Sequence, residues 1–297
     1  MERTTMWENI GVKASTNDFD TLMKEADLDY VAVSKDMYAG APNENPIIVP
    51  DRKIIVREDT KQVFGIVSDR YQICQNKDAL DFVKYIDDIN LIKAGQIGAT
   101  VYMVAQLPEV KILNDSIKPH LIFQNSHDGS SSIKTTICML RMVCQNQFVT
   151  SFKESPATIK ISHLGNLDEK LVVARETLSS VNSYIRNFED TAGELARTRI
   201  TPIEFNKIVE KFFSTSEEFS DRKNKRIEEE RDQFLQALNA DDNANFVKTK
   251  WGMVNAFADF TTHYEPIRKS EGWQENRFLW YLNPSVMDNF IEFVKAA

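Results

Sequence analysis

The sequence predicts an α+β fold in which a mixed or antiparallel sheet with helices precedes an all-helical C-terminal part. Short apolar runs separated by turn residues dominate up to about residue 163. After that point apolar residues recur with helical spacing over long stretches. The first part alternates hairpin patterns with one helix instead of repeating strand–helix–strand units, which disfavours a parallel sheet. We therefore expect an α+β core domain at 1–163 and a helical region at 164–297.

The first elements are predicted from caps and turns. The first forty residues indicate a helical lead-in, whose helix is capped within residues 15–17. Two prolines and two asparagines make residues 41–46 a loop. The apolar runs at 54–56 and 63–67 flank a Glu-Asp-Thr turn and predict a β-hairpin. A helix is expected to begin at Asn76.

The next region returns to strand patterns. Two runs lie around Gly95 and Gly98, and alternation continues through residue 106. Residues 120–124 and 133–139 read as strands joined by a turn that contains Asp-Gly, a favoured hairpin pair. The pattern at 140–152 fits a strand or a helix and does not decide between them.

The C-terminal part is predicted to be helical throughout. Apolar residues from Leu167 onward keep helical spacing and predict one long helix over 167–190. Thr201, Pro202 and Glu204 form the signature of a helix start, with a cap, a proline and a capping-box acid. The charged segment 217–232 is typical of a solvated helix face, with a partner-binding helix as the alternative. Residues 246–264 and 285–295 indicate further helices.

Composition and charge restrict the class of protein. The chain has 297 residues, 42% hydrophobic and 27% charged, which is a normal globular composition. No stretch approaches the length of apolar residues that a membrane span needs, and the N-terminus lacks a signal-like apolar core. We therefore expect a soluble, intracellular protein. Because the net charge is −8, a nucleic-acid site would have to be a local patch on an acidic body.

Catalytic and metal signatures are missing from the sequence. It contains none of the standard phosphate-binding, dinucleotide-binding, zinc-protease or serine-hydrolase motifs. Cys74, Cys138 and Cys144 form no paired motif, so we expect buried reduced thiols; a nucleophilic Cys144 is the less favoured alternative. His127 and His163 suit structural roles better than a metal or nuclease site. We expect no enzyme activity, no cofactor and no metal.

One region differs in charge from the rest of the chain. Residues 111–163 contain six Lys or Arg and three acids, so the segment carries +3 against −8 overall. Three of the four histidines also lie here, together with many Ser, Thr, Asn and Gln residues. Such a mixture suits contacts to phosphate and sugar, although a solvated hairpin would show a similar composition.

The same region carries a family resemblance. SHDGSSSIK at 126–134, followed by LRMVCQNQF at 140–148, resembles the paired signature of the phage/plasmid-like protein family, a domain of unknown function numbered 932. The segments WENIG, VREDTKQVFGIVSDRYQICQN and SHLGNLDEKLVVA fit in the same order, so the resemblance covers roughly residues 7–190. The family usually has Asn-Thr-Leu after Cys-Gln, where this chain has Asn146, Gln147 and Phe148. The resemblance implies a phage, prophage or plasmid context, and with it a location in the cytoplasm of a host cell, but no settled activity.

The positively charged segment 111–163 and the family resemblance together lead to one leading hypothesis. We expect a phage-encoded, sequence-nonspecific protein that binds or anneals single-stranded DNA in replication or recombination, similar in outline to phage annealing proteins. It is expected to act as a homo-oligomer without contacting membranes. The alternative is a phage interaction protein that binds and inhibits a host defence complex. The expected nucleic-acid-binding residues are Tyr71, His127, Lys134, Arg141, Asn146, Lys153 and Lys160.

Overall fold

The computed structural model describes residues 6–41, 45–86, 88–151, 157–167, 169–172, 181–263 and 270–297. Within these ranges the last strand ends at Ile161, and the elements that follow Val181 are helices. Every strand pairing in both sheets is antiparallel. The predicted α+β class is therefore confirmed.

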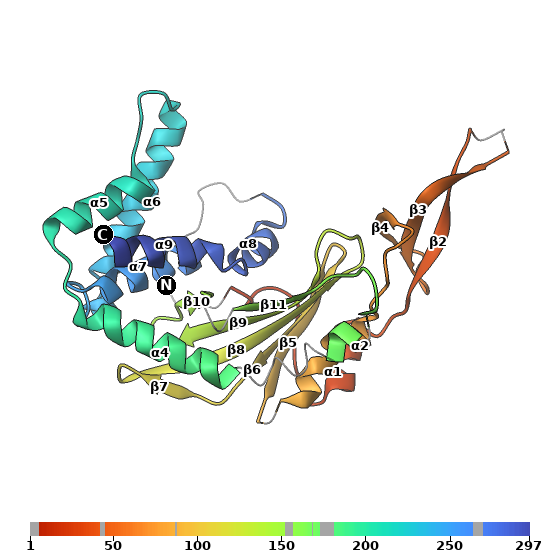
Figure 1. Cartoon of the computed structure of the whole chain (residues 1–297), viewed down its shortest axis with the longest axis horizontal. Helices are drawn as coiled ribbons and strands as arrows, with labels where there is room; N and C mark the ends of the chain where they lie inside the picture. Colours follow the sequence, from red (N-terminus) through yellow and green to blue (C-terminus); the bar gives the residue numbers. More distant parts are fainter. Residues whose placement is uncertain are drawn as a thin grey trace.

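The main sheet has eight strands and forms the centre of the molecule (Figure 1). Its order is β1-β5-β6-β8-β9-β10, with β7 also paired to β8 and β11 also paired to β9. The strands are β1 (Val12–Lys13), β5 (Asn90–Ile97), β6 (Thr100–Gln106), β7 (Val110–Ile112), β8 (Asp115–Ser126), β9 (Ile133–Arg141), β10 (Gln147–Phe148) and β11 (Thr158–Ile161). The strands predicted at 120–124 and 133–139 thus lie in β8 and β9. The segment 140–152, undecided from sequence, ends β9 and then forms the short β10.

A second sheet of three strands projects away from the body (Figure 1). It consists of β2 (Ala32–Ala39), β3 (Ile47–Arg57) and β4 (Val63–Ser68). The hairpin predicted across 54–67 is therefore confirmed. The prediction of a helical lead-in over the first forty residues is correct for one short helix only. Residues 32–39 instead form a strand that pairs with β3. The short helix, Phe19–Glu25, is capped by Asp18, one residue after the predicted capping range of 15–17.

Helices cover both faces of the main sheet (Figure 1). On one face lie α1 (Phe19–Glu25) and α2 (Asn76–Leu80), with the short 3-10 helix η1 (Asp81–Tyr85) after α2. On the other face the ring of Phe278 packs on Tyr102 of β6 at 5.1 Å between centroids. The C-terminal helices are α4 (Val181–Arg197), α5 (Pro202–Phe213), α6 (Asp221–Leu238), α7 (Lys250–His263), α8 (Trp273–Tyr281) and α9 (Ser285–Ala296), with the 3-10 helix η3 (Asp241–Asn243) between α6 and α7.

The helix signals in the C-terminal part agree well with the structure. Thr201 caps α5 as a full capping box with Glu204, and Pro202 is the first helical residue. The charged segment 217–232 becomes helical only at Asp221, behind the cap Ser220. Residues 167 and 169–172 are helical, as is α4, but the middle of the predicted 167–190 helix lies outside the described residues.

The two parts of the chain share one hydrophobic core. A single cluster of buried side chains runs from Trp7 through the main sheet to Val294, so residues of both predicted domains contribute to it. The projecting sheet has a small cluster of its own around Ala32, Ile55 and Val67. Among the described residues, no helix combines the length and the apolar character that crossing a membrane requires.

Candidate functional site

A pocket of about 400 Å³ lies where the projecting sheet meets the end of the main sheet. We call it the junction pocket. Three segments that carry the family resemblance converge there: residues 66–71 of the 56–76 segment, the turn after β8, and the chain just beyond β11. The lining residues are Arg52, Ile66, Val67, Ser68, Tyr71, Asp128, Gly129, Ser131, Ser132, Ser162, His163 and Leu164. Its walls therefore combine hydroxyl groups, one carboxylate, one guanidinium and one imidazole.

A clamp of three side-chain contacts holds the strap of residues 72–76, which leads from the projecting sheet into α2. His163 Nδ1 bonds the Gln72 carbonyl oxygen at 3.1 Å, and Asn125 Nδ2 donates to the Cys74 carbonyl at 2.9 Å. His127 Nε2 bonds Asn76 Oδ1 at 2.7 Å. The three contacts are spaced two residues apart along the strap, so they fix its register against the main sheet.

These contacts also fix the tautomers of both histidines. A carbonyl oxygen only accepts, so Nδ1 of His163 carries its proton and Nε2 holds a lone pair. Asn76 Nδ2 donates to the Leu28 carbonyl, so its Oδ1 accepts from Nε2 of His127, and Nδ1 holds the lone pair there. Neither lone pair has a hydrogen-bond donor among the described residues.

Burial keeps both histidines neutral. Burial, with a smaller contribution from the neighbouring His163, lowers the pKa of His127 to about 4. The pKa of His163 is lowered as well, again through burial. His127 is fully buried and packs against the Phe64 ring at 5.1 Å between centroids, which attaches the projecting sheet to the body. Its predicted role as a surface nucleic-acid contact is therefore corrected to a structural one.

The turn after β8 is ordered around one carboxylate. Asp128 accepts hydrogen bonds from the Ser126 hydroxyl and, at 2.9 Å, from the backbone N–H of Ser130. Burial alone would raise the pKa of Asp128, but the hydrogen bonds from Ser126 and Ser130 outweigh it, and the pKa is lowered. A Cβ on Gly65 of β4 would lie 2.7 Å from Asp128 Cβ, so a glycine is required where the projecting sheet touches this turn.

Two of the predicted site residues lie side by side next to the pocket. Lys134 of β9 is directly opposite Lys160 of β11. Lys160 is exposed and Lys134 half-buried, and neither has an anionic partner among the described residues. Burial lowers the pKa of Lys134, and the charge of Lys160 lowers it further. Like charges directly opposite each other destabilise a sheet, so this pair is costly without an anion.

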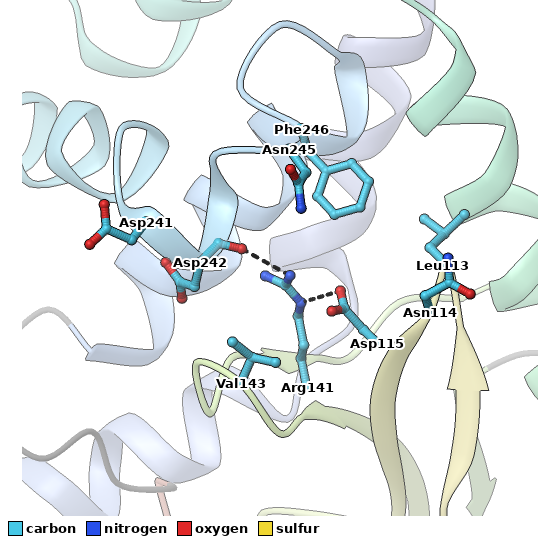
Figure 2. Close-up of a pocket in the computed structure, with 9 residues that line it drawn as sticks. All are labelled: Leu113, Asn114, Asp115, Arg141, Val143, Asp241, Asp242, Asn245 and Phe246. Atoms are coloured by element: carbon cyan, nitrogen blue, oxygen red, sulfur yellow. Dashed lines mark hydrogen bonds and ion pairs between the residues drawn. The ribbon is translucent and has the colours of Figure 1, made fainter.

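Arg141, by contrast, is only 3% exposed and already paired. Its Nε donates to Asp115 at 2.7 Å, and one terminal nitrogen donates to the Asp242 carbonyl at 3.0 Å. Figure 2 shows the guanidinium between these two groups, in a second pocket of about 640 Å³. That pocket carries three aspartates against this one cation. The prediction of Arg141 as a surface phosphate contact is therefore corrected, because its donors are used inside the protein.

The remaining predicted residues have different outcomes. Asn146 is 2% exposed and donates to the Asn255 carbonyl of α7, so its surface role is corrected too. Tyr71 lines the junction pocket, but its ring stacks on His163 at 4.7 Å and its hydroxyl donates to the Ser126 carbonyl. Burial raises the pKa of Tyr71. Lys153 lies outside the described residues.

The cysteines are buried, as expected. Burial raises the pKa of Cys138 and Cys144 to about 12, which disfavours a thiolate at neutral pH. None of the three forms a disulfide in the described part of the chain. Within that part, no group of three or more His, Cys, Asp or Glu side chains is arranged to hold a metal ion.

Several lining residues of the junction pocket were missed from sequence. Arg52 and Ser68 are opposite each other on β3 and β4, whereas Ser162 comes from the distant segment after β11, and each looks like an ordinary polar surface residue in the sequence. Only the serine run at 130–132 gave a local signal, and it reads equally well as a plain turn.

Comparison with known proteins supports the resemblance. The family described as "Domain of unknown function (DUF932)" matches residues 63–280, which is nearly three quarters of the chain. This range contains every residue of the junction pocket except Arg52. No curated protein and no solved structure matches the chain. With so much of its length matched, the chain belongs to the family of domain of unknown function 932.

Proposed function

We propose that the protein binds single-stranded DNA without reading a sequence motif, as a phage protein of replication or recombination. The observation that carries the proposal is the lysine pair, Lys134 opposite Lys160. A protein gains nothing structurally from two adjacent ammonium groups without a counter-charge. A phosphate placed between them removes the repulsion and recovers the cost of half-burying Lys134.

The surroundings favour a backbone contact over base-edge readout of a duplex. Reading duplex sequence requires a helix or a two-stranded ribbon that enters the major groove. The lysine pair instead lies on two paired strands of the main sheet beside the junction pocket, where Ser132 and Ser162 line the wall. Ammonium and hydroxyl groups suit phosphate and sugar, which are the same in every sequence.

The acidic charge of the whole chain favours binding by several copies. A patch of two lysines on a chain of net charge −8 would hold DNA weakly by itself. Linking several such patches raises the total affinity without new contacts. The projecting sheet offers a contact between copies, because Tyr38, Ile47 and Ile48 near the end of its hairpin are 54%, 72% and 57% exposed.

The same exposed sheet is the observation that favours the alternative function. A protein that binds and inhibits a host defence complex needs an apolar surface for its partner, and large exposed apolar patches mark such surfaces. In that case the hairpin would contact a foreign protein, and the lysine pair would have no part in binding.

The deciding experiment reverses the charge of the lysine pair. We expect Lys134→Glu with Lys160→Glu to abolish most binding of a labelled single strand in fluorescence anisotropy at ~50 mM salt. Milder Lys134→Gln with Lys160→Gln should make the log–log salt slope shallower by about 1.4, from roughly 0.7 per lost phosphate contact. The matched control is Arg222→Glu with Lys225→Glu, two exposed cations on α6.

Two results would contradict the proposal. The first is that the wild-type protein fails to bind single strands at low salt. The second is that the α6 control loses as much affinity as the charge-reversed pair, since bulk charge alone would then explain binding.

A further inference from the structure

The junction pocket and the lysine pair belong to one continuous surface. Ser132 lies two residues before Lys134 and directly precedes β9, and Ser162 lies two residues after Lys160 and directly follows β11, the antiparallel partner of β9. At about 3.3 Å per strand residue, the pocket wall begins roughly 7 Å from the lysines. A ligand held by its phosphate on the lysines therefore has its neighbouring groups at the mouth of the pocket.

The volume of the pocket suits a part of a nucleotide. At about 400 Å³ it falls at the lower end of the range of small-molecule sites. Its apolar wall comes from Ile66, Val67 and Leu164, and the Tyr71 ring adds an aromatic surface. A planar, partly apolar group with polar edges would match these walls, and an unpaired nucleobase has this chemistry.

The carboxylate of Asp128 in the pocket favours a donor on the ligand. Nε2 of His163 has no donor in the described part of the chain, but the atom itself is buried and is not open to a ligand in the pocket. Asp128 uses Oδ1 for the Ser126 and Ser130 contacts, which leaves Oδ2 as a second acceptor. A carboxylate oxygen only accepts, so Oδ2 would repel a carbonyl oxygen and attract an amino group. Arg52 and the serine hydroxyls that line the same pocket can donate to the O2 carbonyl, which cytosine and thymine share.

We propose that the junction pocket receives one unpaired base of the bound strand and prefers bases that present an amino group. This inference rests on the proposed function, since the strand must first be held by the lysine pair. Cytosine and thymine give the sharpest comparison, because the two rings have the same size. Cytosine carries an amino donor where thymine carries a carbonyl acceptor.

The test compares three oligonucleotides of equal length and charge: oligo-dC, oligo-dT and an abasic strand. We expect the wild-type protein to bind oligo-dC roughly tenfold tighter than oligo-dT, the discrimination that one well-placed polar contact supplies. The abasic strand should bind no better than oligo-dT, with the same salt slope as both.

The substitution Asp128→Asn should remove or reverse the preference for oligo-dC over oligo-dT without disturbing the turn. The asparagine Oδ1 still accepts from Ser126 and Ser130, while its amide nitrogen replaces Oδ2 with a donor. We expect the dC-to-dT ratio to fall to about one or to invert. Asp69→Asn is the matched control, because it removes the same charge from an exposed neighbour that does not line the pocket, and should leave the ratio unchanged. Thermal melting confirms that both variants are folded.

The outcomes separate this inference from the proposed function. Equal binding of all three strands by the wild-type protein would overturn the pocket assignment while the lysine pair stands. A dC preference that survives Asp128→Asn would also overturn it. If the protein binds none of the strands, the proposed function fails and the inference fails with it.

Discussion

Arg141 and Asp242 are 101 residues apart in the chain, yet the Arg141 guanidinium donates to the Asp242 carbonyl at 3.0 Å. The same side chain donates to Asp115 of β8 at 2.7 Å. One buried arginine thus ties the end of β9 to η3, the connection between α6 and α7. Because one buried side chain makes both contacts, we infer that Arg141 holds the strand-rich part and the helical part together.

Replacing this arginine should cost stability and spare DNA binding. We expect Arg141→Met to lower the free energy of unfolding by about 3 kcal/mol or more, because Asp115, itself only 19% exposed, loses its counter-charge. Urea denaturation measures the loss. Once corrected for the folded fraction, the DNA affinity of the variant should equal that of the wild type. A folded Arg141→Met protein that no longer binds DNA would return Arg141 to the binding site.

The error over Arg141 has a physical origin. The +3 charge of residues 111–163 is a sum along the chain and does not say which way each side chain faces. Helices cover both faces of the main sheet, so most of β9 is buried on both sides. Lys134 remains half-exposed beside the β8–β9 turn, whereas Arg141 at the far end of the strand meets the helical part. No local pattern distinguishes these two ends.

Elements that depend on residues close together in the sequence could be predicted from it. The capping box at Thr201 and the hairpin across 54–67 depend on residues that are neighbours in sequence, and both are present. The junction pocket depends on β3, β4, the β8–β9 turn and the chain after β11 meeting in space. Such a site becomes visible only through tertiary packing, as does the clamp on residues 72–76.

Three buried histidines should make stability depend on pH in a defined window. Burial lowers the pKa of His120 and His127 to about 4 and also lowers that of His163. In the unfolded chain their pKa is about 6.5, so the unfolded state binds more protons between about pH 6.5 and 4. Stability should be fully present above about pH 6.5 and fall as the pH drops through this window.

The expected slope is on the order of 1 kcal/mol per pH unit for each histidine. Urea denaturation at a series of pH values measures it. His120→Phe keeps a ring against Trp7, at 5.0 Å between centroids in the wild type, and should remove the contribution of one proton. A wild-type stability that stays flat from pH 6.5 to 4.5 would show that these histidines are not held neutral in the folded protein.

Association between copies should depend on the hairpin of the projecting sheet. Ile47 and Ile48 of β3 lie opposite Ala39 and Tyr38 of β2, and both isoleucines are more than half exposed. A monomer gains nothing from holding this apolar group in water, whereas burying it between two copies is favourable at about 25 cal/mol per Å². Sedimentation velocity should therefore show a wild-type oligomer that Ile47→Lys with Ile48→Lys converts toward monomer.

The control for this prediction is Ile203→Lys, since Ile203 of α5 is 70% exposed but lies outside the projecting sheet. It should leave the oligomer intact. If association supplies the multivalency that DNA binding needs, the Ile47/Ile48 variant should also bind single strands more weakly, with the lysine pair unchanged. A wild-type protein that stays monomeric at micromolar concentration, or an oligomer that survives both hairpin lysines, would remove the hairpin from assembly and leave its exposed surface for a different partner.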